Sequence, residues 1–141
     1  MNWLDVKVSL ELLKKIAGEL PRNDEKERLN MDDCIFCKIV KGEIPSKKVY
    51  EDDDTYAFHD INPIAPVHLL LIPKLHIDSL AAADESHAAL LGKLLLLAPK
   101  LAKQHGLDSV FRTAIHTGRD GGQLVFHLHL HIIGGGKLSP L

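Results

Sequence analysis

The chain has 141 residues, of which 45% are hydrophobic and 26% are charged, and its formal net charge is -2. This length and composition fit one compact domain with a hydrophobic core, and they exclude a collagen-like, coiled-coil or wholly disordered chain. The near-neutral charge argues against a protein that binds nucleic acid or anionic membranes, because such binding needs an excess of Lys and Arg.

Residues 1–20 place their apolar side chains at alternating spacings of three and four, which predicts an amphipathic helix. Residues 21–30 are charged and almost devoid of apolar groups, which indicates a linker. We therefore expect an N-terminal helix and linker over 1–30 and one folded domain over 31–141. The helix docks on that domain in one interpretation, and it contacts a dimer partner or another protein in the other.

The compartment is predicted from three features of the sequence. Acidic side chains interrupt the apolar residues of positions 1–20, which is not typical of a signal or transit peptide. The apolar run 94–99 is too short to span a bilayer. Cys34 and Cys37 are too near each other to close a useful disulfide loop. We expect a soluble, cytoplasmic protein.

The rest of the chain is patterned as short strands, short helices and one long helix. Residues 35–40 predict one or two helical turns, and residues 84–105 predict the long helix, with Asp84 as its N-cap and Gly106 at its C-terminal end. Strands are expected over 47–50, 55–59, 67–72, 110–115 and 125–133. Because these strands include neighbours with no helix between them, the fold class is α+β with an antiparallel sheet.

Two of these segments carry a more specific expectation. The run 67–72 is continuously apolar and ends at Pro73, which favours a strand buried on both faces. The acidic run 51–54 is expected to be a solvated turn, with weak cation binding as the alternative.

The strongest chemical signal is the alternation of His127, His129 and His131 with apolar residues. In a strand, alternate side chains project from one face, so these imidazoles would lie roughly 6.5 to 7 Å apart along the strand. Neutral imidazoles can ligate a metal, or act as a nucleophile and a proton donor near neutral pH. The alternative is a polar, solvent-exposed face.

Residues 117–123 form a glycine-rich segment just before the histidines. Three glycines in five residues allow the backbone to approach a ligand and to point N–H groups at an anion. Such a segment is often only a hairpin loop. Next to three histidines, however, it is consistent with a phosphate cradle and with phosphoryl or nucleotidyl transfer through a histidine–phosphorus bond.

The segment 121–131 resembles the signature of the histidine triad (HIT) superfamily, His-φ-His-φ-His-φ-φ, in which φ is apolar. Five upstream stretches match in order and are similar to the Hint branch, the histidine triad nucleotide-binding proteins. These stretches are 34–39, 43–45, 58–63, 65–68 and 72–77. The resemblance covers roughly residues 33–136 and implies a HIT-like, five-stranded antiparallel sheet with one long helix and short helices. The N-terminal amphipathic helix lies outside it.

The resemblance implies a homodimeric hydrolase that cleaves purine nucleoside 5′-phosphoramidates, such as adenylate joined to an amine, through a nucleotidyl-histidine intermediate. His129 would be the nucleophile that attacks the α-phosphorus. His131 would donate a hydrogen bond to the phosphate or the bridging atom, and His68 would orient the nucleophile and relay protons. No organic cofactor, nucleic-acid partner or membrane partner is expected.

The same resemblance implies the nucleotide-binding residues. Asp60 would accept hydrogen bonds from both ribose hydroxyls, or, as the alternative, it caps the turn before Asn62. Gln123, with Gly122 and the N–H groups around it, would hold the phosphate oxygens. The residues expected to line the base pocket, most of which could equally be ordinary core, are Ile35, Phe36, Ile39, Ile44, Phe58, His59 and Ile61.

Cys34 and Cys37 have a spacing found in metal sites, although two ligands alone do not make a structural site. The resemblance supplies His76 and His127 as the other two ligands. We therefore expect a structural zinc in a Cys₂His₂ site that ties the N-terminal segment to the catalytic strand. The alternatives are a cysteine pair without metal and a thioredoxin-like redox pair.

Two residues depart from the family pattern. Leu124 stands where the family usually has Ser or Thr, whose hydroxyl contacts the phosphate or the departing group. His116 stands where the family has an Asn that contacts the sugar or phosphate, and it can still donate a hydrogen bond. Residues 137–141 also lack the aromatic side chains with which some relatives complete the neighbouring subunit's site. Slow turnover or a different leaving group is expected.

These departures keep other functions open. Leu124 motivates a nucleotide-sensing or scaffold protein with little turnover. A second alternative makes the three triad histidines ligands of a catalytic zinc. A third is a dinucleoside polyphosphate hydrolase of the related Fhit branch, which the stretches 34–39 and 58–63 disfavour because they resemble Hint.

Overall fold

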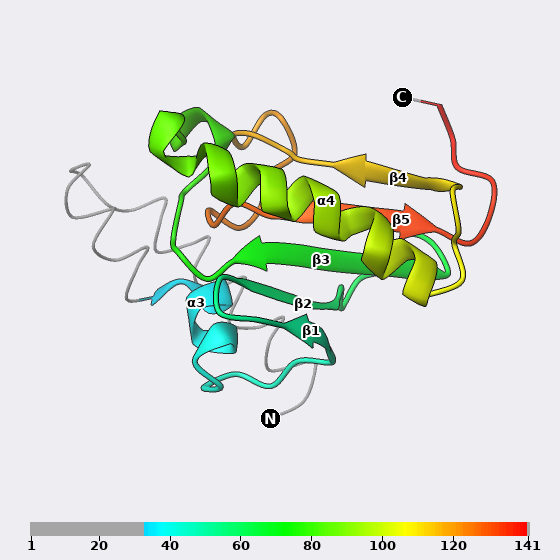
Figure 1. Ribbon diagram of the computed structural model, residues 1–141, viewed down its shortest axis with the longest axis horizontal. Coiled ribbons are helices and arrows are strands. Elements are labelled where there is room, and N and C mark those ends of the chain that lie inside the picture. The colour runs from blue at the N-terminus through cyan, green and yellow to red at the C-terminus, as the bar shows by residue number, and fades with distance from the viewer. Residues whose placement is uncertain (1–32, 141) are drawn as a thin grey trace.

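Five antiparallel strands form one sheet in the order β1-β2-β3-β5-β4 (Figure 1). The strands are β1 (Lys48–Glu51), β2 (Thr55–His59), β3 (Val67–Pro73), β4 (Phe111–Ala114) and β5 (Leu130–Gly134). The computed structural model describes residues 33–140, so the helix and linker predicted over 1–30 lie outside the described residues. The predicted α+β class with a five-stranded antiparallel sheet is confirmed.

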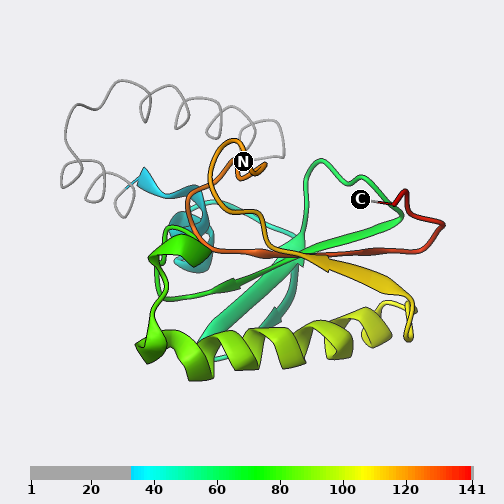
Figure 2. The ribbon, with the colours of Figure 1, turned by 90° about the horizontal axis from the view of Figure 1, so that it is seen from above.

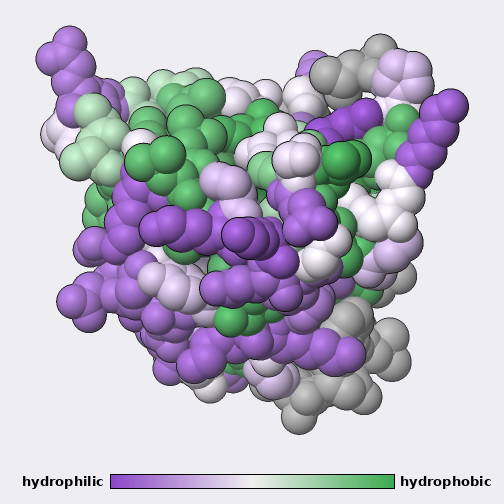
Figure 3. Space-filling model, turned by 45° about the vertical axis from the view of Figure 1, so that its right-hand side comes forward, coloured by the Kyte–Doolittle hydropathy of each residue, from purple (hydrophilic) through white to green (hydrophobic). Residues whose placement is uncertain are grey.

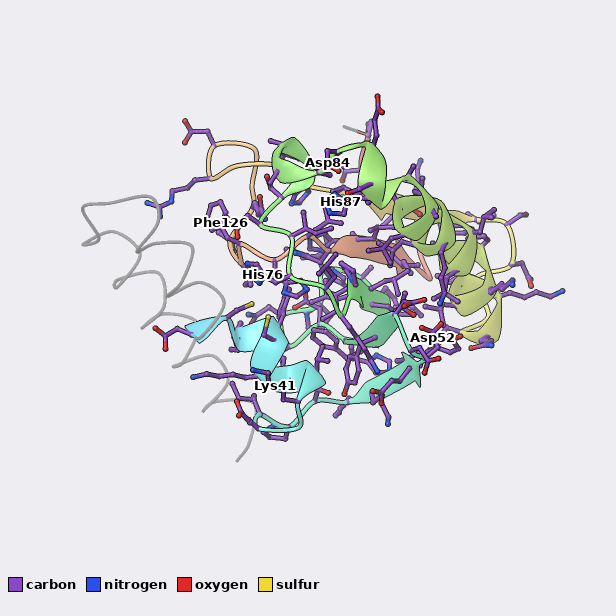
Figure 4. The ribbon with its side chains drawn as sticks, turned by 60° about the vertical axis from the view of Figure 1, so that its left-hand side comes forward. Lys41, Asp52, His76, Asp84, His87 and Phe126 are labelled. Carbon is purple, nitrogen blue, oxygen red and sulfur yellow. The ribbon has the colours of Figure 1, made fainter. Side chains whose placement is uncertain are left out.

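Four helical segments accompany the sheet in the part of the chain that the structure describes. They are α3 (Ile35–Val40), η1 (Leu80–Ala82), η2 (Glu85–His87) and α4 (Ala88–Gln104). Asp84 is an N-cap as predicted, but it caps the 3₁₀ turn η2, and α4 follows directly (Figure 4). α4 continues through Pro99, and Gly106 follows its C-terminal end with a φ of 78°. Within residues 33–140, no helix is long and apolar enough to cross a membrane.

The sheet separates two apolar cores. α4 covers one face, and α3 lies on the opposite side (Figure 2). On β3, Leu69 and Leu71 belong to the core under α4, whereas Leu70 and Ile72 belong to the core under α3. The continuous apolar run of β3 therefore comes from burial on both faces, as predicted.

The acidic turn between β1 and β2 is organised by Asp52 (Figure 4). Its carboxylate accepts hydrogen bonds from the backbone N–H groups of Asp54 and Thr55, at 2.9 and 2.8 Å. Lys93 of α4 lies 3.1 Å from both Asp52 and Asp54. Although burial opposes ionisation, these donors hold the pKa of Asp52 well below its usual range. The turn is thus tied to α4 through Lys93.

The strand predicted over 125–133 is shorter than expected. β5 begins only at Leu130, because β3 pairs with it from that residue onwards and β4 pairs with it only from His131. Residues 125–129 precede this ladder, and 125–127 are bent. Leu128 donates its N–H to the carbonyl of Ile77 at 2.7 Å. The alternation survives the bend, since Leu128, Leu130 and Ile132 all belong to the core under α4.

Candidate active site

A cavity of about 390 Å³ lies on the face of the sheet opposite α4. This volume is within the range of small-molecule sites. The predicted site residues that line it are Ile35, Phe36, Ile39, Phe58, His59, Asp60, Ile61, His68, His116, Gly122, Leu124, His129 and His131. The structure therefore brings together all three predicted catalytic histidines and most of the predicted nucleotide-binding residues.

Two predicted nucleotide-binding side chains do not line this cavity. Ile44 is buried in the core under α3. Gln123 is also buried, and its Oε1 accepts the N–H of Gly118 at 2.9 Å. Its Nε2 donates to the carbonyls of Asp78 and Val125, at 2.7 and 3.0 Å. Because both amide hydrogens are used, the Gln123 side chain holds the glycine-rich loop in place.

Several lining residues were not predicted from the sequence. They are Pro45, Ser46, Lys47, Asn62, Ile64, Leu70, Arg112, Ala114, Val125 and Ile133. The signal that identifies some of them is the strand register, because Ala114 lies opposite His131 and Arg112 lies opposite Ile133. Cross-strand partners share a face of the sheet. Arg112 also donates a hydrogen bond to the carbonyl of Ser139 in the C-terminal tail.

His129 is oriented by the backbone just before it. Its Nδ1 lies 2.7 Å from the carbonyl oxygen of His127. A carbonyl only accepts hydrogen bonds, so Nδ1 carries the proton of the neutral ring and Nε2 keeps its lone pair. The Phe36 ring packs edge-on against His129, with centroids 5.1 Å apart. His129 therefore offers Nε2 as a nucleophile or a hydrogen-bond acceptor.

His68 links Asp60 to His131. The backbone N–H of Ile64 donates to His68 Nδ1 at 3.2 Å, so the neutral His68 ring carries its proton on Nε2. That Nε2 lies 2.9 Å from His131 Nδ1 and 3.3 Å from Asp60 Oδ2. When it donates to His131 Nδ1, the proton of His131 is left on Nε2. His131 is thereby prepared to donate a hydrogen bond.

Burial keeps these imidazoles uncharged. It lowers the pKa of His129 and of His68. Burial, with the neighbouring histidines, lowers the pKa of His131 to about 3. At neutral pH the rings are therefore neutral, which a nucleophilic imidazole requires.

Asp60 has two separate contacts. Its Oδ1 accepts the backbone N–H of Asn62 at 2.8 Å, which caps the turn. Its Oδ2 faces His68. The carboxylate also lines the cavity, so capping the turn leaves it available to a ligand.

The four predicted metal ligands come together at the start of α3, where Figure 4 shows His76 close to the helix. We call Cys34, Cys37, His76 and His127 the Cys–His cluster. Their ligand atoms lie within 4.8 Å of one another. The Nδ1 of His127 lies 3.4 Å from Cys34 Sγ and 3.5 Å from Cys37 Sγ, and His76 Nδ1 lies 3.4 Å from Cys37 Sγ.

The donor set of the Cys–His cluster fits zinc. His127 Nε2 lies 2.8 Å from the carbonyl of Pro73, and His76 Nε2 lies 2.7 Å from the Asp78 carboxylate. These acceptors take the Nε2 protons, so both Nδ1 lone pairs face the thiols. A hydrogen bond from Cys34 lowers the pKa of Cys37, against the effect of burial. Nitrogen and sulfur ligands of a tetrahedral zinc lie about 3.6 Å apart, close to the separations found here.

The three triad histidines do not form a common metal site. Among residues 33–140, His127 groups with the cysteines, His131 groups with Asp60 and His68, and His129 belongs to neither group. The second group is not a favourable site, because His68 Nδ1 already accepts an N–H and a metal on Nε2 would need the ring to lose its last proton. The alternative of a catalytic zinc on the triad therefore has no support in the geometry.

Comparison with known proteins identifies the family. The sequence model of the HIT domain matches residues 41–138. Protein HitA of Neisseria gonorrhoeae is 60% identical over 104 residues, which cover 74% of this chain and 97% of HitA. The 14 kDa zinc-binding protein of Zea mays is 46% identical over 123 residues, which cover 83% of this chain and 96% of the relative.

Solved structures give the same result. The HIT family hydrolase from Legionella pneumophila superposes with a TM-score of 0.74 at 44% identity, covering 75% of this chain and 96% of that protein. The histidine triad nucleotide-binding protein from Candida albicans superposes with a TM-score of 0.64 at 36% identity, covering 77% of this chain and 85% of that protein. The sequence-based resemblance to histidine triad proteins is confirmed.

Proposed function

The chain belongs to the HIT family, and from that premise we propose that it hydrolyses purine nucleoside 5′-phosphoramidates through a nucleotidyl-histidine intermediate. The observation that carries the proposal is the orientation of His129, whose Nδ1 proton is donated to the His127 carbonyl at 2.7 Å. Nε2 thereby keeps its lone pair in a residue that lines the cavity. A neutral nucleophile suits an α-phosphorus, since its anionic oxygens repel negative charge.

In the first step, the Nε2 lone pair of His129 forms a bond to phosphorus and the phosphorus–nitrogen bond to the amine breaks. The amine nitrogen keeps the bonding electrons and takes a proton from His131 Nε2. As that proton leaves, His131 Nδ1 takes the proton of His68 Nε2, 2.9 Å away, and the solvent of the cavity beside Asp60 returns a proton to His68 Nε2. The Nδ1–H of His129 remains hydrogen bonded to the His127 carbonyl, which stabilises the positive charge on the substituted ring.

In the second step, water attacks the same phosphorus and the bond to His129 Nε2 breaks. The electrons of that bond return to the ring, the water loses a proton to solvent, and the nucleoside 5′-monophosphate leaves. Two displacements at one phosphorus replace a single, slower attack by water.

The nucleotide would lie across the cavity with its base over α3. Phe36, Ile39 and Phe58 form an apolar slot there. Asp60 would accept the ribose hydroxyls, and the backbone around Gly122 would hold the phosphate oxygens together with His116. Few polar groups face the base in this slot, so we expect only a weak preference between purines.

The test compares the wild-type protein with His129→Ala on an adenosine 5′-phosphoramidate. We expect the wild type to release the amine and adenylate, and His129→Ala to lose at least about a thousandfold in kcat while still binding adenylate. Equal hydrolysis by both proteins would contradict the assignment of His129.

Leu124 favours a second function. Its side chain lines the cavity, is 60% exposed and has no hydrogen-bond donor for a departing group. A nucleotide sensor or scaffold would therefore bind adenylate with the same pocket but release no product. Binding of the phosphoramidate without hydrolysis in both proteins of the test above would support this alternative.

We propose further that the Cys–His cluster holds a structural zinc, which would cross-link α3 to residues 76 and 127 and take no part in the reaction. Supporting observations are the four convergent ligand atoms and the maize relative named as a zinc-binding protein. Metal analysis should find one zinc per chain in the wild type and in His129→Ala. Loss of the zinc from His129→Ala would point to a catalytic metal.

The assembly and compartment are also part of the proposal. β4 lies at one edge of the sheet, and Val110, which directly precedes it, is more than half exposed, as are Leu95 and Leu96 of α4. On the side of the molecule seen in Figure 3, apolar side chains gather in the upper part. A homodimer would cover such surface, and sedimentation equilibrium tests it.

Two free cysteines fit the reducing cytoplasm. We also propose the division of the chain into an N-terminal segment, 1–30, and a HIT domain over 31–141.

A further inference from the structure

His129, the proposed nucleophile, directly precedes β5 and is not itself part of the sheet. The β5 ladder begins at Leu130, one residue after His129, so strand pairing does not fix the residues just before it. Gln123 holds Val125, and Leu128 is hydrogen bonded to Ile77. The other hydrogen bonds of this segment involve His127, and the ring of His129 also packs edge-on against Phe36.

His127 has two different roles. Its ring is fully buried and belongs to the Cys–His cluster, and its Nε2–H donates a hydrogen bond to the carbonyl of Pro73. Its own carbonyl accepts the Nδ1 proton of His129 at 2.7 Å. The same residue therefore connects the cluster to the atom that decides which nitrogen of His129 is protonated.

We propose that the Cys–His cluster is a positioning device for the nucleophile. When its four side chains ligate a metal, the ring of His127 is fixed, its carbonyl is held toward His129, and Nε2 of His129 faces the phosphorus with its lone pair. The inference rests on the proposed function, in which His129 attacks. It goes beyond a structural zinc, because it assigns the cluster a specific effect on one catalytic ring.

The base pocket has a second support besides the cluster, although Cys34 of the cluster belongs to the same core. Ile35, Phe36 and Ile39 of α3 are buried against Phe58 and Leu70 of the sheet, so apolar packing holds this wall. Loss of the metal should therefore disturb the orientation of His129 more than the affinity for adenylate. A merely structural cluster would instead weaken binding, turnover and stability together.

The experiment uses a matched pair of variants at His76, a residue of the Cys–His cluster that does not line the cavity. His76→Ala removes a ligand, whereas His76→Cys keeps four zinc ligands. Wild type treated with a chelator gives the metal-free state without a substitution. Asp52→Asn, which loosens the turn bound to Lys93 on the α4 side, controls for loss of stability without contact with the site.

The first readout is the tautomer of His129 in the free protein, measured by long-range ¹H–¹⁵N NMR of its ring at constant pH. We expect a single Nδ1–H form in zinc-loaded wild type, His76→Cys and Asp52→Asn. Chelated wild type and His76→Ala should show a mixture of the two tautomers. An unchanged Nδ1–H form in both metal-free proteins would overturn the proposal.

The second readout separates kcat from the dissociation constant of adenylate. Metal removal should lower kcat at least about tenfold, as the loss of groups that orient a site typically does, and should change adenylate affinity less than about threefold. An equal loss in kcat and affinity, or global unfolding on chelation, would also overturn the proposal, since either makes the cluster a folding element.

The outcomes distinguish this inference from the proposed function. If zinc-loaded wild type binds adenylate but hydrolyses no phosphoramidate, the function fails, and the tautomer measurement still decides whether the cluster orients His129. If the wild type is active and the metal-free proteins keep the tautomer and kcat, the inference fails and the function stands.

Discussion

The two faces of the central strands β3 and β5 differ in chemistry although they share a backbone. The α4 face carries Leu69, Leu71, Leu130 and Ile132, all buried in one aliphatic core. The opposite face carries imidazoles and a cavity. The difference shows that one short ladder can supply stability on one side and chemistry on the other. Substitutions on the two faces should therefore have separable effects.

The largest effect on stability is expected on the α4 face. Leu101 of α4 is fully buried in that core, so Leu101→Ala should lower the free energy of unfolding by about 2 to 5 kcal/mol through the cavity that it leaves. Because the cavity opens away from the histidines, kcat measured well below the melting temperature should change less than about twofold. Chemical denaturation and steady-state kinetics check the two halves of this prediction. A parallel loss of kcat would show that the faces are coupled.

The dependence of the free energy of unfolding on pH should come mainly from the histidines of the opposite face. Burial and the charges of His129, His68 and His116 lower the folded pKa of His131 from 6.5 to about 3. Below pH 6.5 the unfolded chain therefore binds a proton on this histidine that the folded chain does not bind. The contribution of the neutral ring to the free energy of unfolding is fully present above pH 6.5 and is lost as the pH falls toward 3. Asp60, which faces His68, is the acidic group of this network.

His131→Asn should reduce this loss. We expect the melting temperature of the wild type to fall more steeply between pH 6.5 and 4 than that of His131→Asn, with Leu101→Ala as a control that keeps the wild-type slope. Thermal denaturation followed by circular dichroism over this pH range is the measurement. Identical slopes for wild type and His131→Asn would contradict the titration assigned to this ring.

The smallest expected effect concerns the departing group. Leu124 lines the cavity where the family pattern has a hydroxyl, so Leu124→Ser should raise kcat for a phosphoramidate about tenfold, the effect of one hydrogen bond of roughly 1.4 kcal/mol. Leu124→Ala provides the matched control, because it shortens the side chain without adding a donor. An equal increase in both variants would mean that bulk, and not the missing donor, limits turnover.

The sequence was sufficient to predict features that depend on local patterns. The alternation of the histidines with Leu128 and Leu130 predicted which side chains face the core. The continuous apolar run predicted that β3 is buried on both faces. The four metal-ligand positions that the family resemblance implied do converge in space.

Features that depend on distant partners were not predicted. β5 begins at Leu130, where the ladder with β3 ends at Leu71 although β3 itself continues to Pro73, and the pairing with β4 ends at Ala114. Arg112 and Ala114 reach the cavity through the register of β4 against β5, which the sequence does not encode locally. Gln123 matches the family motif that was expected to hold phosphate, but its side-chain amide donates hydrogen bonds to the carbonyls of Asp78 and Val125 within the protein.

The identity of the nucleophile is the central claim, and trapping its covalent intermediate tests it most directly. The protein would be mixed with an adenosine 5′-phosphoramidate, quenched within the first turnover and analysed by peptide mass spectrometry. We expect an adenylyl group on the peptide that contains His129, located on that histidine by fragmentation. An adenylyl group on another residue, or rapid release of adenylate with no adduct at any time, would contradict it.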